Sequence, residues 1–149
     1  LAEYLLSRFC FIAHPSKVGD DIGSDFLCTM FHSKRIGGHQ MRVPRGAFAI
    51  QIKSSRKTMD VTKHLQYFED LDLPYFVGVV RQAESAMDVY SAEFLPVLLI
   101  HHEYKGKLLR LKLVDSFVPT PENYCVLKRG ELSLRRLFDY DFEFQSTPR

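Results

Sequence analysis

The chain has 149 residues, of which 46% are hydrophobic and 26% charged, the composition of an ordinary globular domain with one core. Lys and Arg outnumber Asp and Glu by only 20 to 18, so the formal net charge of +2 is too small to indicate a nucleic-acid partner by itself. Three scattered cysteines without a C-x-x-C pair exclude a disulfide framework, and no apolar run reaches the roughly 20 residues of a membrane helix.

These properties predict one cytoplasmic domain over residues 1–149 that has no membrane partner. We expect its core at about 1–115 and a C-terminal extension at 116–149, where the sequence signal is weak. Because the first residue is Leu1 rather than Met, we also expect the chain to be a piece of a longer protein.

The first half of the chain predicts a helix followed by a β-hairpin. Leu1, Leu5 and Phe9 recur at helical spacing, so a helix is expected from Leu1 to about Cys10. A loop of turn-forming residues at 14–24 then leads to Asp25. Strands are expected at 25–31 and 47–53, joined by a polar hairpin.

Along the second of these strands, alternation separates an apolar face from a polar one. Phe48, Ile50 and Ile52 are expected to face the core. Gln51 and Lys53 share the opposite face, about 7 Å apart along the strand at its usual rise.

The second half predicts a helix and several strands. Thr58 is expected to cap a helix from Met59 to Leu71, and Leu73-Pro74 to end it. The continuous apolar run Tyr75–Val80 is typical of a fully buried strand. Further elements are expected as strands at 87–90 and 108–114, and as a helix or strand at 93–102 and 132–137. The order predicts an α/β fold with a central mixed β-sheet flanked by a helix on each side.

Three residues suit the hydrolysis of a phosphodiester. That reaction requires a divalent cation held by oxygen ligands, a polarised water and a positive group near the phosphate. Asp25 opens one strand, and Gln51 and Lys53 end the next. If the two strands pair as a hairpin, these ends meet.

The same residues carry a resemblance to a known family. Asp25 and Gln51-Ile52-Lys53, with Asp21-Ile22-Gly23-Ser24 before the first strand and Glu3 on the first helix, resemble the PD-(D/E)XK nuclease superfamily. The similarity is to the branch with Gln-x-Lys, and it looks like a bacterial nuclease-like domain group of unknown function. It covers roughly residues 1–100, and it implies a restriction-endonuclease-like fold and a Mg²⁺ or Mn²⁺ cofactor.

The resemblance also implies roles for these residues. Asp25 would be the main metal ligand, Gln51 an amide-oxygen ligand with the Ile52 carbonyl beside it, and Lys53 the catalytic cation. Glu3 would be an auxiliary ligand, and Glu3 or Asp21 would compensate for the missing charge of Gln51, where most family members have a carboxylate. The alternatives are a solvated helix-face acid at Glu3, a turn or cap residue at Asp21, and an exposed strand end at Gln51–Lys53.

Basic residues surround this predicted site. The segment between the two strands contains Lys34, Arg35, Arg42 and Arg45. Together with Arg56 and Lys57, they would form a basic rim that contacts phosphates next to the site. The alternative is a solvated hairpin tip that its charge keeps from aggregating.

The expected function is therefore a metal-dependent nuclease that cuts nucleic acid, with DNA as the expected substrate. One alternative is a nuclease-like module without activity, which binds nucleic acid or protein within a bacterial defence or regulatory system. The neutral Gln51 keeps this alternative open. A third hypothesis is an interaction protein that uses the apolar segment 94–100 to form a homodimer or to bind an operon partner or a larger multidomain protein.

Overall fold

The computed structural model describes residues 1–15, 23–92 and 110–115, and also the backbone of 131–140. The described residues form an eight-stranded sheet in the order β1-β2-β3-β5-β6-β8-β7-β4. Its strands are β1 (Cys10–Ala13), β2 (Phe26–Ile36), β3 (His39–Lys53), β4 (Met59–Asp60), β5 (Tyr75–Arg81), β6 (Ala86–Ser91), β7 (Arg110–Val114) and β8 (Glu131–Tyr140). The pairs β3–β5 and β7–β8 are parallel and the others antiparallel, which confirms the predicted α/β class with a mixed sheet.

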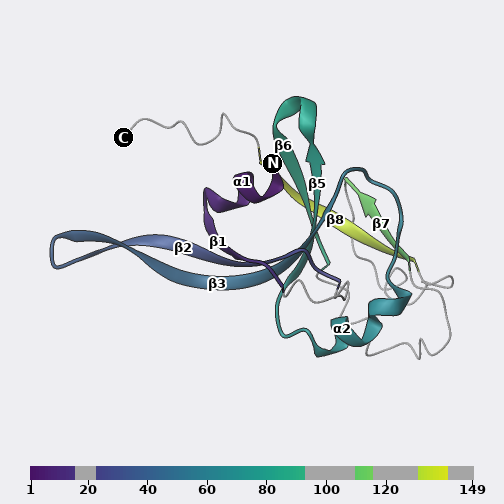
Figure 1. The fold of residues 1–149 in the computed structure, drawn as a ribbon, viewed down its shortest axis with the longest axis horizontal. Helices are drawn as coiled ribbons and strands as arrows, with labels where there is room; N and C mark the ends of the chain where they lie inside the picture. Colours follow the sequence, from purple (N-terminus) through teal and green to yellow (C-terminus); the bar gives the residue numbers. More distant parts are fainter. Residues whose placement is uncertain (16–22, 93–109, 116–130, 141–149) are drawn as a thin grey trace.

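The predicted hairpin is confirmed, and it is longer than expected. β2 and β3 pair from Phe26 opposite Ile50 to Ile36 opposite His39. The turn consists of Gly37 and Gly38, both with positive φ, which is the conformation that matches the twist of a two-residue hairpin. Figure 1 shows the two strands running out of the body as a narrow ribbon.

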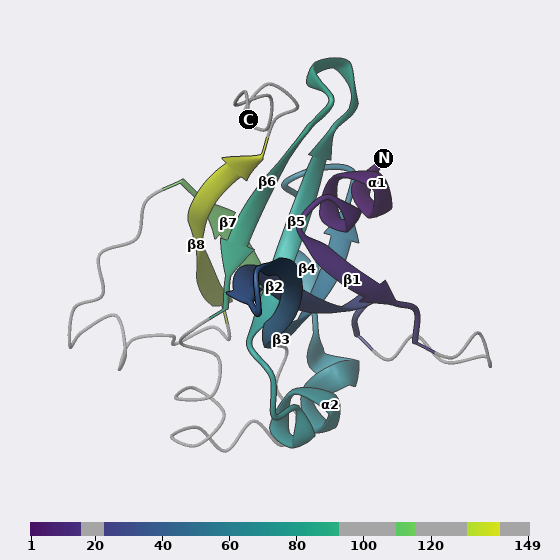
Figure 2. The ribbon, with the colours of Figure 1, turned by 90° about the vertical axis from the view of Figure 1, so that its left-hand side faces the viewer.

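Two short helices pack on opposite faces of the sheet (Figure 2). On one face, Leu5 and Leu6 of α1 (Ala2–Ser7) join a core that includes Phe48 and Ile50 of β3. On the other face, Phe68 of α2 (Leu65–Asp70) joins a second core. Each helix has only six residues, so the helical flanks are small.

The second face of β3 changes from apolar to polar near the end of the strand. Ala49 belongs to the core under α2 and is fully buried. The same face becomes polar only at Gln51 and Lys53, which are half-buried. The transition from core to polar surface therefore occurs within the last residues of β3.

Both predicted helices are too long. The first ends at Ser7, and residues 10–13 form β1, with Cys10 opposite Met30 of β2. The second begins only at Leu65, after a 3₁₀ turn at Thr62–His64 (η1), and Thr58 does not cap it. Met59 instead pairs with Leu111 of β7. Pairing with distant strands overrides the local helical pattern in both places.

The later strands largely follow the prediction. β5 and β6 are confirmed, β5 is followed by a 3₁₀ turn at Gln82–Glu84 (η2), and β7 is confirmed from Arg110. β8, expected within a C-terminal extension, lies inside the sheet between β6 and β7. The predicted element at 93–102 and the interface segment 94–100 lie outside the described residues. Among the helices described, none has the length and apolarity to cross a membrane.

Candidate active site

Asp25 lies beside the end of β3, where the hairpin ladder stops. Its backbone N–H donates to the Ile50 carbonyl at 3.0 Å, and its carboxylate Oδ2 accepts the Ile52 backbone N–H at 2.6 Å. The carboxylate therefore accepts a hydrogen bond from a β3 N–H that lies beyond the last residue pair of the β2–β3 ladder. The structure brings Asp25, Gln51 and Ile52 together, and Asp25 remains exposed to solvent.

Gln51 is held by neighbours on three sides. The Tyr75 hydroxyl donates to the Gly23 carbonyl at 2.9 Å and lies 3.3 Å from the Gln51 amide. In the amide orientation that satisfies both ends, Nε2 donates to the Gly23 carbonyl at 2.8 Å and Oε1 accepts from Lys53 Nζ at 3.3 Å. Gln51 thus links the approach to Asp25 with the ammonium group of Lys53.

The residues before Asp25 are fixed against α2. The Ser24 hydroxyl lies 2.6 Å from the Tyr67 hydroxyl, within hydrogen-bonding distance. Gly23 has φ +87°, and a Cβ at this position would lie 2.9 Å from the Tyr67 ring. Only glycine fits this conformation and this contact without strain.

We therefore expect Gly23→Ala to lower the free energy of unfolding by about 1–3 kcal/mol, from backbone strain and the clash with Tyr67. Denaturant titration measures the loss. Gly38→Ala is the matched control, because Gly38 has φ +85° but no atom near its Cβ position. Equal losses in the two variants would contradict a packing role for Gly23.

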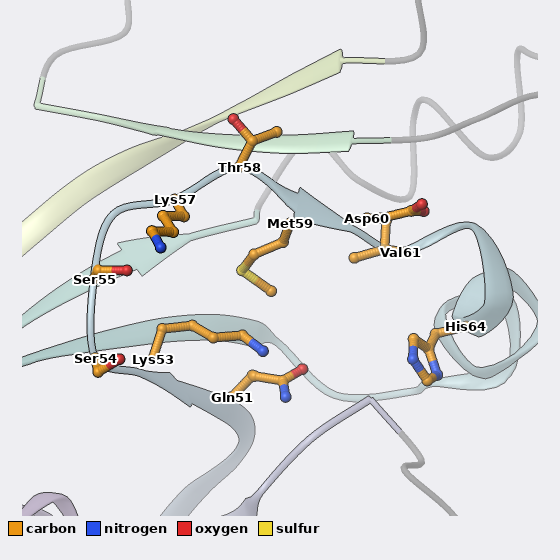
Figure 3. A pocket seen from close by; sticks show the side chains of 10 residues that line it. All are labelled: Gln51, Lys53, Ser54, Ser55, Lys57, Thr58, Met59, Asp60, Val61 and His64. Carbon is orange, nitrogen blue, oxygen red and sulfur yellow. The ribbon is translucent and has the colours of Figure 1, made fainter.

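A pocket of about 260 Å³ opens next to Gln51 and Lys53 (Figure 3). Its opposite wall is β4 and the η1 turn that follows, from which Met59 and His64 face the same space. β3 and β4 are far apart in the strand order, yet they line one pocket, so the sheet must curve around it. The lining residues are Gln51, Lys53, Ser54, Ser55, Lys57, Thr58, Met59, Asp60, Val61 and His64.

The charges of this pocket favour an anion. Within the described part of the chain, Lys53 and Lys57 form no ion pair. Asp60 is the one acidic residue in the lining, and Figure 3 shows its carboxylate directed away from Lys53. Hydrogen bonds from Thr62 hold the pKa of Asp60 below its usual value, so Asp60 is ionised and offsets one of the two lysine charges, which leaves the lining with a net positive charge.

Of the five predicted metal ligands, only Gln51 lines this pocket; Asp25 and Ile52 contact each other outside its lining. Glu3 lies on α1, which packs on the face opposite Gln51 and Lys53, and its Oε1 is 3.2 Å from His14 Nε2. The structure thus does not bring Glu3 to the pocket that Gln51 and Lys53 line. Asp21 lies outside the described residues.

Arg56 has a different environment from the one expected of a phosphate contact. Its guanidinium donates to Asp115 Oδ1 at 2.7 Å and to Asp88 Oδ2 at 3.1 Å, and it lies over the Tyr90 ring. Asp88 is buried, with 2% of its side chain exposed. The hydrogen bond with Asp88 raises the pKa of Arg56 above its usual value. Arg56 therefore compensates a buried carboxylate.

The donors present fit a magnesium ion if a substrate phosphate completes its ligands. Mg²⁺ commonly uses one or two carboxylates, retained waters and phosphate oxygens. The described residues offer the Asp25 carboxylate, the Gln51 amide and the Ile52 carbonyl. No group of three or more His, Cys, Asp or Glu side chains suited to a metal occurs in the ranges described above.

Sequence reasoning missed the far wall of the pocket and the tyrosines behind Gln51. Met59 and His64 carry no local signal of their position, because β4 reaches the pocket only through its pairing with β7. Tyr75 does have a local sequence signal. Its hydroxyl stands at the start of an apolar strand, and a buried hydroxyl requires a polar partner.

In comparisons with known proteins, no protein-family profile, curated protein or solved structure matches the chain.

Proposed function

We propose that the chain is a metal-dependent nuclease that hydrolyses phosphodiester bonds at the end of β3. One observation carries the proposal. The Asp25 carboxylate accepts the Ile52 N–H beside Gln51 in β3, and Lys53 lies between Gln51 and a polar pocket whose lysines form no ion pair with any other described residue. Such a site combines oxygen ligands for a cation with positive charge for a phosphate.

In this proposal, Asp25, Gln51 and the Ile52 carbonyl hold a magnesium or manganese ion. When bound, the ion supplies positive charge at the phosphate and lowers the pKa of a coordinated water. Lys53 contacts the phosphate oxygens and stabilises the charge that develops on them. Gln51 positions Lys53 through its amide oxygen, and Lys57 binds the neighbouring phosphate in the pocket.

A binding module that does not cut is the second candidate, and a specific observation favours it. The donor oxygens of the site already accept protein hydrogen bonds, since Asp25 Oδ2 accepts from Ile52 and Gln51 Oε1 from Lys53. Lys57, Ser54 and Ser55 nevertheless line the pocket. The same residues would then bind a phosphate without hydrolysing its ester.

The deciding experiment incubates the protein with supercoiled plasmid, linear DNA, single-stranded DNA and RNA. Each substrate is tested with magnesium, manganese or a chelator. We expect metal-dependent cleavage, reduced about 100-fold in Lys53→Ala because a positioned charge at the transition state is lost. Lys112→Ala, which removes an exposed lysine from β7 outside the pocket, should retain wild-type activity.

Two results would contradict this proposal. No cleavage of any substrate under any condition would favour the binding module. Full activity in Lys53→Ala would remove Lys53 from the reaction. Because both variants lose one positive charge, the comparison separates the role of Lys53 from a general effect of charge.

A further inference from the structure

The β2–β3 ribbon is a basic arm that the rest of the described chain does not cover. Every residue from 32 to 42 is exposed, and Figure 1 shows the two strands extending away from the other elements. At the usual rise, residues 32–36 and 39–43 extend for about 17 Å. A two-stranded ribbon without a packed face is at best marginally stable alone, so a bound partner would stabilise this one.

The charge of the ribbon selects the kind of partner. Residues 31–46 contain four Lys or Arg and no acidic residue. Within the described residues, none of the four forms an ion pair. A second copy of the ribbon would be repelled by like charge, whereas a polyanion would be attracted. The four residues are Lys34, Arg35, Arg42 and Arg45.

The strand register places three of these four residues, Lys34, Arg35 and Arg42, on two different faces. Ser33 is opposite Arg42, and Arg35 is opposite Gln40, so beyond the Phe31–Pro44 pair one face carries only hydrogen-bonding side chains. On the other face Lys34 is opposite Met41, His32 is opposite Val43 and Ile36 is opposite His39, so apolar side chains alternate with polar ones there. Arginine, glutamine and serine are side chains that hydrogen-bond to the edges of bases.

We infer that the ribbon lies in the major groove of B-form DNA, with the face of Ser33, Arg35, Gln40 and Arg42 towards the bases. That groove is about 12 Å wide and admits a two-stranded ribbon. The major groove of an A-form RNA duplex is too narrow for side chains to read. The inference takes nucleic acid as the ligand from the proposed function. It narrows the substrate to duplex DNA.

Binding is measured in a chelator, so its result does not depend on cleavage. Fluorescence anisotropy would compare a DNA duplex, an RNA duplex of the same sequence and the single DNA strand. We expect the DNA duplex to bind at least tenfold more tightly than either other probe. Methyl green, which fills the major groove, should compete with the protein, whereas netropsin, which fills the minor groove, should not.

Variants of equal charge change test the orientation of the ribbon. Arg35→Gln and Arg42→Gln should each weaken DNA binding about tenfold. Lys34→Gln on the opposite face should weaken it about twofold, through the loss of one charge alone. All three positions are exposed, and unchanged melting temperatures would verify the fold.

Three results would overturn the inference. Equal affinity for the DNA and RNA duplexes would indicate attraction to phosphates without entry into the groove. Competition by netropsin alone would place the ribbon in the minor groove. Equal losses in Lys34→Gln and Arg42→Gln would exclude the proposed face. Cleavage of DNA in the presence of any of these results would leave the proposed nuclease activity standing.

Discussion

Replacing Asp25 with asparagine is expected to lower metal-dependent cleavage about a thousandfold with little change in stability. Asparagine retains an oxygen that accepts the Ile52 N–H, but it loses the negative charge that attracts a divalent cation. A bound metal contributes several kcal/mol of transition-state stabilisation, and about 1.4 kcal/mol corresponds to a tenfold change in rate. Initial rates with magnesium and manganese measure the effect.

A second readout tests metal binding apart from activity. A ligand that binds only the folded state raises the melting temperature, so magnesium or manganese should stabilise the wild type and not Asp25→Asn. Asp25→Ala should lose about 1 kcal/mol of stability as well, because it also removes the acceptor of the Ile52 N–H. Wild-type activity in Asp25→Asn would exclude Asp25 as the main ligand.

Replacing Arg56 with alanine is expected to lower the free energy of unfolding by roughly 2–3 kcal/mol. The buried Asp88 carboxylate would lose one of its two arginine partners, with Arg81 still at 3.3 Å. Breaking a fully buried ion pair costs about 3–5 kcal/mol, and both the remaining arginine and the 41% exposure of the Arg56 side chain reduce that cost. The melting temperature should fall by about 5–10 °C, as measured by thermal unfolding.

The other partner of the same guanidinium provides a matched control. Asp115 is 60% exposed, so its ion pair with Arg56 is screened by solvent. Asp115→Asn should therefore change stability by less than about 1 kcal/mol. A loss of DNA binding in Arg56→Ala, without a loss of stability, would contradict the structural role and restore Arg56 to the nucleic-acid interface.

Several features of this protein could be predicted from the sequence because neighbouring residues determine them. Gly37-Gly38 between two strand patterns specifies the hairpin turn, and the apolar run of β5 specifies a buried strand. Alternation along β3 places Gln51 and Lys53 on one face, and the hairpin brings the Asp25 carboxylate to the N–H of Ile52, which lies between them. The association of these three residues follows from chain geometry over short distances.

Only the tertiary structure decided the rest of the site. The sequence after Thr58 has a helical pattern, but in the structure Met59 pairs as a strand with Leu111, 52 positions away. This pairing forms the far wall of the pocket. The sequence predicts Arg56 to be an exposed cation, whereas in the structure its guanidinium donates to the buried Asp88. Both outcomes depend on contacts between distant segments, whose energies exceed the local preferences that a sequence pattern records.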